Sequence, residues 1–318
     1  MSLKNLPIGL YGAVMGLAGL GLSARAAATL FPGTFRAPAY FTELWVALGA
    51  IALAILLPLY LFKIIFYREE AKKDFTDPAL LGFCGALPVG MTLVAGGIGP
   101  YVPAFADALW WTGCALLACF MVWALLRWLS GGIELAKLNA GWLIILVGGI
   151  VVPGPGIALG HAEASRYLFG VSVCACALLL PVLIYRAGMA GPLPEALRPT
   201  WFILLVPPSL IYANGMALFA VEFLEILYFF GTLLAVVLFV YARNLLRWPF
   251  GPAWWAFTFP LDAFAYASAH YAQSHPSMLW KGVAGSALLL ATLVVSFVLL
   301  KSFYFLFATR RTAASPKA

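Results

Sequence analysis

The stretch PAWWAFTFPLDAFAYASAHY, residues 252–271, has the composition of a membrane-embedded helix, but it carries a proline in its middle. Phe259 precedes that proline, Pro260, and Asp262 follows two residues later. A proline inside a helix removes one backbone hydrogen bond, and in lipid the freed carbonyl must find a partner in protein or water. We therefore expect this segment inside a helical bundle or beside a wet cavity, rather than against lipid.

The composition of the whole chain indicates a polytopic membrane protein. Of its 318 residues, 64% are hydrophobic and 10% are charged, whereas soluble domains have about a quarter charged residues. Its long apolar runs favour membrane helices of about 20 residues over the short alternating strands of a β-barrel. The predicted fold class is an all-α polytopic membrane protein, with a single transmembrane domain over residues 1–318. Ten spans are expected, at about 6–30, 39–66, 79–99, 103–128, 140–158, 163–186, 199–218, 221–243, 252–272 and 277–307.

The net charge of +7 is explained by membrane topology better than by a nucleic-acid partner. With ten spans and both termini on one side, fifteen of the 19 Lys and Arg residues fall on that side. Because cytoplasmic loops are enriched in Lys and Arg, both termini are predicted to be cytoplasmic. The start of the chain also has features of a cleavable signal peptide, namely Lys4, an apolar stretch and ARA at 24–26. Cleavage there would leave nine spans.

The odd-numbered spans differ from the even ones in proline and glycine. Each contains or opens on a proline; these include Pro7, Pro88, Pro153, Pro207 and Pro260. The first also places Gly9, Gly12, Gly16 and Gly19 on one helix face, because they are three or four residues apart. The pattern predicts five repeated hairpins around an axis, with the odd spans bent and lining a central pore.

Candidate catalytic groups are sparse. The five cysteines and three histidines show no metal or haem spacing, and no nucleotide-binding or hydrolase motif occurs. We therefore predict neither an enzyme nor a cofactor nor a metal site. Asp262 is the most deeply placed acid, and such residues are functional suspects. It could be a proton-relay carboxylate; we favour an acid hydrogen-bonded to backbone opened by Pro260, or one reaching the outer vestibule.

Two motifs resemble a known family. AWWAFTFP (253–260) is similar to the ninth-helix signature of the tellurite-resistance/dicarboxylate transporter family, and LPIGLYGAVMGLAGLGL (6–22) is similar to its first helix. This family includes bacterial tellurite-resistance proteins and the plant guard-cell slow anion channels. The resemblance implies quasi-fivefold symmetry, a homotrimer with one pore per protomer, and a bacterial inner membrane. It also implies chloride and nitrate as permeant ions, with organic acids or sulfite in some relatives.

The resemblance further implies a gate at Phe259, packed near Gly12 on the first helix. The pore lining would include Gly12, Gly16, Pro88, Pro153, Pro207 and Pro260. Asp262 departs from the small or hydroxyl residue expected there, which keeps a second hypothesis open.

The first hypothesis is a gated channel for small monovalent anions, occluded by Phe259. Since the pore helices offer little fixed positive charge, its selectivity would come from the basic loops and the cost of dehydrating the ion. The second is a proton-linked exporter of an organic acid or oxyanion, such as a dicarboxylate, sulfite or tellurite, that uses Asp262. A membrane anchor or quinone-binding subunit of a redox complex is the third.

Overall fold

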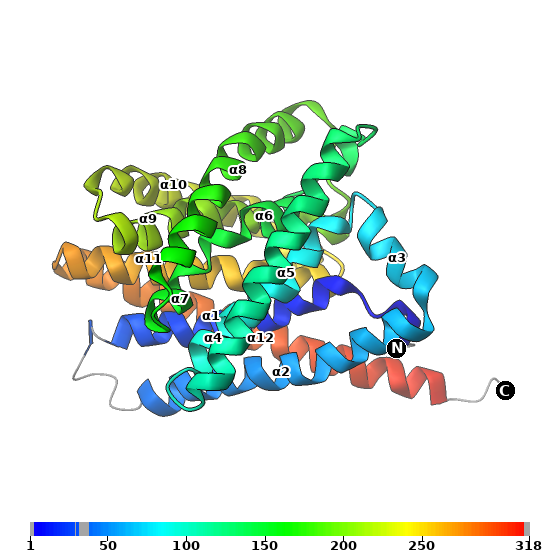
Figure 1. Ribbon diagram of the computed structural model, residues 1–318, viewed down its shortest axis with the longest axis horizontal. Helices are drawn as coiled ribbons and strands as arrows, with labels where there is room; N and C mark the ends of the chain where they lie inside the picture. The colour runs from blue at the N-terminus through cyan, green and yellow to red at the C-terminus, as the bar shows by residue number, and fades with distance from the viewer. Residues whose placement is uncertain (1–2, 29, 32–37, 315–318) are drawn as a thin grey trace.

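The computed structural model describes residues 3–28, 30–31 and 38–314, and every regular element in these ranges is a helix. The α-helices are α1 (Tyr11–Ala28), α2 (Pro38–Phe66), α3 (Arg68–Thr76), α4 (Ala86–Ile98), α5 (Pro103–Leu129), α6 (Trp142–Val147), α7 (Pro153–Ala158), α8 (Ala162–Met189), α9 (Val206–Phe219), α10 (Glu225–Tyr241), α11 (Thr258–Ser274) and α12 (Met278–Ala314) (Figure 1). Short 3-10 helices join several of them, among them η3 (Leu81–Gly85), η5 (Gly148–Ile150), η6 (Glu195–Leu205) and η9 (Pro252–Phe257).

The protein is a multi-pass membrane protein. Within the described residues, eight helices are long and apolar enough to cross a bilayer, and they coincide with eight of the predicted spans. The predicted fifth span is the shorter apolar segment Trp142–Ala158, which η5 interrupts. The predicted ninth is the succession of η9 and α11. The all-helical class is therefore confirmed, whereas the count of ten crossings stays a prediction.

Burial divides the helical segments into two sets. We call the segments that contain α1, α4, α6 with α7, α9 and α11 the inner segments, and α2, α5, α8, α10 and α12 the outer helices. In the apolar stretches of the inner segments Ile8–Ala28, Leu81–Ile98 and Glu195–Phe219, 72%, 94% and 83% of the residues are buried. In those of the outer helices, only 22% to 33% of the residues are buried. Because lipid is as apolar as the exposed side chains, the outer helices can leave most of their surface uncovered.

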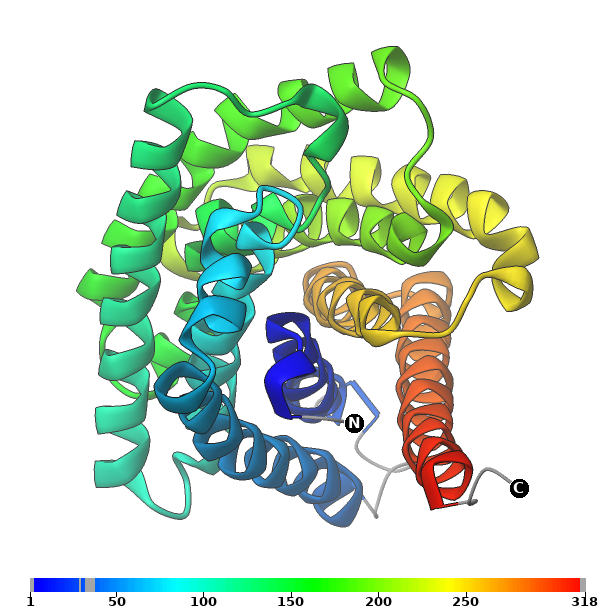
Figure 2. The ribbon, with the colours of Figure 1, turned by 90° about the vertical axis from the view of Figure 1, so that its right-hand side faces the viewer.

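The inner segments contact one another in a closed cycle. Helix α1 packs against α4, α4 against α7, α7 against α9, α9 against α11, and α11 against α1. Each inner segment also packs against the outer helix that follows it in the chain. Figure 2 shows α1 and α11 towards the middle of the molecule, with α2, α5 and α12 at the periphery. The start of α1 and the end of α12 lie at the same end of the molecule (Figure 1).

The prolines of the inner segments mark a change of helix type. Pro88, Pro207 and Pro260 lie in the first turn of α4, α9 and α11, directly after a 3-10 helix, and Pro153 is the first residue of α7. The first turn of an α-helix has N–H groups without intrahelical partners, so a proline there loses no hydrogen bond. The expected bend at these prolines stays a prediction, whereas the change of helix type was not foreseen. Each consists of a 3-10 helix or short helix followed by an α-helix.

Candidate functional site

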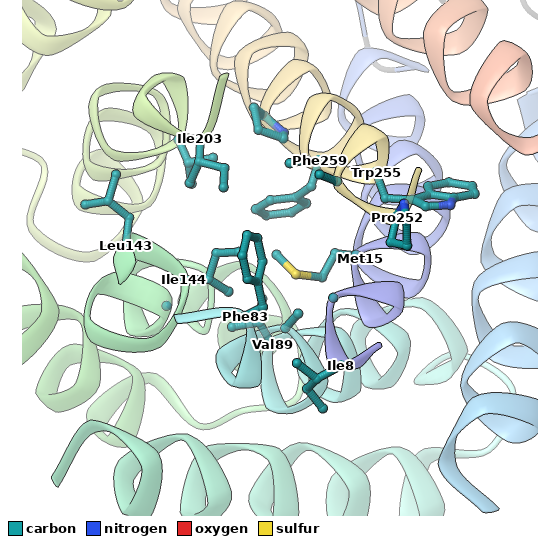
Figure 3. A pocket seen from close by; sticks show the side chains of 18 of the residues that line it. Ile8, Met15, Phe83, Val89, Leu143, Ile144, Ile203, Pro252, Trp255 and Phe259 are labelled. Atoms are coloured by element: carbon teal, nitrogen blue, oxygen red, sulfur yellow. The ribbon is translucent and has the colours of Figure 1, made fainter. Parts of the chain in front are cut away.

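A cavity of about 270 Å³ opens between the inner segments on the side where α1 begins. We call it the apolar cavity. All five inner segments line it, with Met15 from α1, Val89 from α4, Ile144 from α6, Ile203 from η6 and Phe259 from α11 among the lining residues. Figure 3 shows the side chains of Met15, Phe83 and Phe259 projecting into this space from different helices. Its wall is therefore apolar over most of its extent.

A second cavity, of about 320 Å³, lies between the same five segments towards the other end of α1. We call it the Arg25 cavity. Leu93 of α4, Gly154 of α7 and Asn214 of α9 line it, together with residues of α1 and α11. Unlike the apolar cavity, it has several polar lining residues; these are Ser23, Arg25, Asn214, Tyr266 and His270.

Phe259 belongs to the walls of both cavities. Val151 is the other residue that lines both. Phe259 is only 6% exposed, so its ring is enclosed by protein rather than turned towards lipid. The two cavities thus lie along one axis through the inner segments, and the benzyl side chain of Phe259 lies between them.

The glycine face of α1 explains how α11 comes close enough to place this ring. Gly12 faces Trp255, Gly16 lies directly against Thr258, and Gly19 faces Phe259. A Cβ atom added at Gly19 would lie 2.9 Å from the Phe259 ring. The glycine that accommodates the ring is therefore Gly19, and the expected partner, Gly12, is wrong by two helical turns. This register depends on how α1 and α11 pack together, which a motif within one helix does not specify.

The remaining predicted pore residues fall into two groups. Gly12, Pro207 and Pro260 line the apolar cavity. Gly16 and the prolines Pro88 and Pro153 line neither of the two cavities within the described structure. Gly16 is covered by Thr258 and the two prolines are buried at helix starts, so their place in a pore lining stays a prediction.

Asp262 is fully buried on the side of α11 that faces α1. One of its carboxylate oxygens would lie 3.0 Å from a Cβ atom at Gly19, and its backbone carbonyl accepts a 2.7 Å hydrogen bond from the Ser23 hydroxyl. Neither carboxylate oxygen has a hydrogen-bond partner within the described residues, and Asp262 lines neither cavity. The interpretation of a hydrogen-bonded or vestibular acid is therefore wrong. Its exclusion from both cavities also does not favour a proton-linked exporter that uses this residue.

Arg25 lines the Arg25 cavity, although the sequence alone indicates only on which side of the membrane it lies. Its guanidinium donates to the carbonyls of Gly96 (3.2 Å) and Gly97 (2.8 Å) and to both Glu43 carboxylate oxygens (3.1 Å each). A hydrogen bond to Glu43 raises the pKa of Tyr101, which lies in the adjacent loop. The expectation that the predicted pore helices offer little fixed positive charge therefore needs correction at Arg25, which lines the Arg25 cavity from α1. The signal was available, because Arg25 is an isolated charge at the end of an apolar run.

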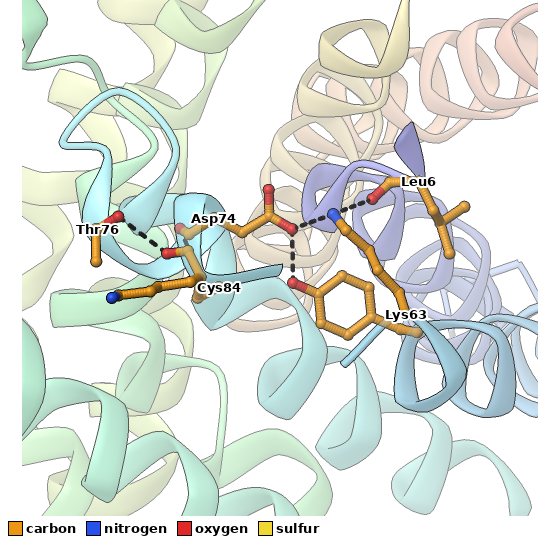
Figure 4. A network of polar contacts seen from close by, with 7 residues as sticks. Leu6, Lys63, Asp74, Thr76 and Cys84 are labelled. Atoms are coloured by element: carbon orange, nitrogen blue, oxygen red, sulfur yellow. Dashed lines mark hydrogen bonds and ion pairs between the residues drawn. The ribbon is translucent and has the colours of Figure 1, made fainter. Parts of the chain in front are cut away.

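A buried ion pair, Lys63–Asp74, lies at the wall of the apolar cavity. Lys63 donates to Asp74 (2.6 Å) and to the carbonyl of Leu6 (2.8 Å), and the Tyr60 hydroxyl donates to the same Asp74 oxygen (2.7 Å) (Figure 4). Lys63 and Asp74 are 2% and 5% exposed. Asp74 is the only charged residue among the described residues that line the apolar cavity. The network ties α2 and α3 to the segment before α1, so this charge is neutralised where it reaches the cavity.

Comparison with known proteins agrees with this arrangement. The model of a family described as "Voltage-dependent anion channel" matches residues 5–303. The chain belongs to this family. Among curated relatives, the S-type anion channel SLAH3 of Arabidopsis thaliana is 26% identical over 316 residues, which cover 97% of this chain and 49% of that protein. The guard cell S-type anion channel SLAC1 of the same plant is 24% identical over 92% of this chain and 54% of its own length.

A bacterial relative matches over most of both chains. The tellurite resistance protein TehA homolog of Haemophilus influenzae is 24% identical over 305 residues, which cover 94% of this chain and 90% of that protein. The chain spans about half the length of the plant channels it matches. The resemblance inferred from the two sequence motifs is confirmed over nearly the whole chain.

Proposed function

We propose that this protein is a gated anion channel whose conduit runs through the apolar cavity and the Arg25 cavity and is occluded by Phe259. One observation carries the proposal: the Phe259 ring forms part of both cavity walls, and all five inner segments contribute to each wall. An apolar side chain in a narrow passage blocks ions sterically and by dewetting. The names of the plant relatives, which are called anion channels, support the same function.

The architecture we propose is ten membrane crossings arranged as five hairpins with approximate fivefold symmetry. The closed cycle of contacts among the inner segments, and the packing of each on its following outer helix, support this arrangement. The single transmembrane domain would then consist of an inner ring that lines the conduit and an outer ring that faces lipid. Interrupted helices fit the inner position, because non-helical backbone inside a membrane must be covered by protein or line a wet cavity.

Chloride and nitrate are the proposed ions. A largely apolar wall strips water from a passing ion without replacing its hydration, so weakly hydrated monovalent anions would pass most easily. Arg25 adds positive charge at one end, although Glu43 balances part of it. The proposal needs no cofactor.

We further propose a homotrimer with one conduit in each protomer, in the plasma (inner) membrane of a bacterium with both termini cytoplasmic. The match to the bacterial relative over most of its length supports the location. The excess of Lys and Arg on one side supports the orientation of the termini.

The test is anion flux through liposomes that contain the full chain. Replacing Phe259 with Ala removes the side chain between the cavities. We expect initial chloride efflux to rise more than about tenfold, equivalent to lowering the barrier by about 1.4 kcal/mol or more. Phe264→Ala is the matched control, because Phe264 lies on the same helix and lines neither cavity. Its efflux should equal that of the wild type.

Size-exclusion chromatography of each variant would establish that it remains folded. Unchanged efflux in a folded Phe259→Ala variant would contradict the assignment of the gate. An equal rise in Phe264→Ala would indicate general leakiness, and it would also overturn the assignment.

A further inference from the structure

The end of the molecule where α1 begins and α12 ends carries its charge unevenly. The segments after α2 and α5, residues 63–77 and 127–137, hold six Lys and Arg residues and five Asp and Glu residues. The segments after α8 and α10, residues 186–198 and 243–254, together with Lys301 of α12, hold five cations and one acid, Glu195. The enrichment of Lys and Arg in cytoplasmic loops concerns the two sides of a membrane. It therefore does not explain a difference between two parts of the same side.

Aromatic rings hold two cations of the second group. The Arg198 guanidinium lies 6.0 Å from the centroid of the Trp248 ring. The Lys301 ammonium lies 4.8 Å from the centroid of Trp254 and 5.3 Å from that of Phe250. The elements that carry these residues pack on one another, η6 against η9 and η9 against α12. Because a ring face attracts a cation without neutralising it, both positive charges stay available to an anion.

Two further arginines complete this surface. Arg243 and Arg247 are exposed in η8 (Ala242–Arg247), the 3-10 helix that follows α10. Within the described residues neither of them forms an ion pair with an acid, and neither does Lys301. Figure 2 shows the yellow segment after α10 and the red end of α12 on the same side of the molecule, away from α3. We call this surface the basic–aromatic face, and its residues are Arg198, Arg243, Arg247, Lys301, Trp248, Phe250 and Trp254.

Exposed apolar side chains border these cations. Leu246 is 76% exposed within η8, and Leu300 and Tyr304 are exposed on either side of Lys301 in α12. A free phosphate has nothing to place against such groups, whereas a phospholipid carries its phosphate next to its acyl chains. The combination of unpaired cations and apolar surface therefore fits an anionic amphiphile.

We propose that the basic–aromatic face binds the headgroup of an anionic phospholipid from the leaflet at this end of the molecule. A zwitterionic headgroup would bring an ammonium group to a surface whose nearby acid, Glu195, is already paired with Arg198 at 3.0 Å. An anionic headgroup brings negative charge without that ammonium group. The inference goes beyond the proposed function, because no residue of this face lines either cavity.

Thermal unfolding of the full chain in mixed micelles tests the inference. Phosphatidylglycerol and phosphatidylcholine with identical acyl chains are the matched probes, because their headgroups differ in net charge. A molecule that binds the folded state raises its unfolding temperature. We expect phosphatidylglycerol to reach half of its effect at a mole fraction about tenfold lower, since one cation near an anionic lipid contributes about fivefold. Glycerol 3-phosphate, which lacks acyl chains, should cause no shift, and a shift equal to that of the lipid would overturn the proposal in favour of a free phosphate ester.

Two double variants with the same loss of charge locate the effect. Arg243→Gln combined with Arg247→Gln should lower the preference for phosphatidylglycerol about fivefold or more. Lys72→Gln combined with Lys73→Gln is the matched control, because these are exposed cations of α3 outside the basic–aromatic face, and it should leave the preference intact. Arg243→Lys combined with Arg247→Lys keeps both charges and should keep the preference.

Three results would overturn the inference. The first is equal stabilisation by the two lipids. The second is a preference that survives the loss of both arginines, or that falls equally in the α3 control, which would reflect net charge alone. The third is dissociation of an oligomer in the arginine variant during size-exclusion chromatography, which would make this face a contact between copies. Because the measurement is unfolding rather than flux, its outcome is independent of the channel proposal.

Discussion

The apolar cavity and the Arg25 cavity are built by the same five inner segments, yet their walls differ in chemistry. The apolar cavity has one charged lining residue in the described structure, Asp74, and Lys63 neutralises it. The Arg25 cavity is lined by a cation, an amide, a phenol and an imidazole. The 3-10 helices and helix starts border the first, whereas later turns of the α-helices border the second.

The difference divides the work along the proposed conduit. An apolar passage raises the energy of every ion and so controls whether ions pass. A wall with donors and acceptors distinguishes between ions and so controls which of them enter. Phe259 lies where the two environments meet.

The largest expected effect concerns the ion pair at the apolar end. Lys63→Met leaves the Asp74 carboxylate buried without its cation, which should lower the free energy of unfolding by about 3–5 kcal/mol. Thermal and denaturant unfolding in detergent would measure the loss. Lys137→Met is the control, because the Lys137–Glu134 pair is exposed and should contribute under about 1 kcal/mol. A loss in Lys63→Met no larger than in this control would show that the apolar end does not depend on the pair.

The contact that positions the gate should have the next largest effect. Gly19→Ala places a methyl group 2.9 Å from the Phe259 ring, and overpacking of this kind costs about 1–3 kcal/mol of stability. The ring must move, so basal chloride efflux should rise, although less than in Phe259→Ala. Gly231→Ala is the control, because its Cβ atom would meet Pro208 at an ordinary 3.7 Å and Gly231 lines neither cavity. Equal behaviour of the two alanine variants would separate Gly19 from the gate.

Substitution of Asp262 is expected to stabilise the protein, unlike the two substitutions above. Its carboxylate is buried without a hydrogen bond in the described structure and lies outside both cavities. Asp262→Leu should therefore raise the free energy of unfolding by about 1 kcal/mol or more, with unchanged anion flux. Asp262→Asn keeps a buried polar group and should gain less. Flux that is lost in both variants would instead give Asp262 a transport role.

The smallest expected effect is electrostatic. Arg25→Gln removes the cation from the Arg25 cavity and should lower chloride flux about two- to threefold at low ionic strength. A partly exposed charge contributes up to about 1 kcal/mol to its interaction with an ion. Added salt should narrow the difference by screening. Lys281→Gln is the control. Arg25 lies near the end of the first predicted span and Lys281 near the start of the tenth, so both fall on the side opposite the termini, but Lys281 lines neither cavity. An effect of Arg25→Gln that persists at high salt would indicate a structural role through Glu43.

Much of the functional region could be predicted from residues close together in the chain. The AWWAFTFP stretch pointed to Phe259 and the helix that carries it, because it resembles a family signature and because Pro260 directly follows the ring. The alternation of proline-containing and smooth apolar runs likewise predicted which segments are buried and which are exposed.

The errors concern residues whose partners are distant in sequence. Gly12 was chosen in place of Gly19 because the register between α1 and α11 depends on how two helices about 240 residues apart in the sequence pack together. The ion pair between Lys63 and Asp74 and the bonds from Arg25 to α4 were missed for the same reason. Counting Lys and Arg residues could assign Lys63 and Arg25 only to one side of the membrane or the other.

The sequence by itself determined that the chain crosses a membrane repeatedly and which runs avoid lipid, because hydrophobicity and proline position act locally on each segment. Only the tertiary structure decided that Phe259 contributes to the walls of two cavities and that Asp262 lines neither of them. The physical reason is that a cavity belongs to no single segment. It is the space left when five segments pack, and its chemistry depends on their mutual register.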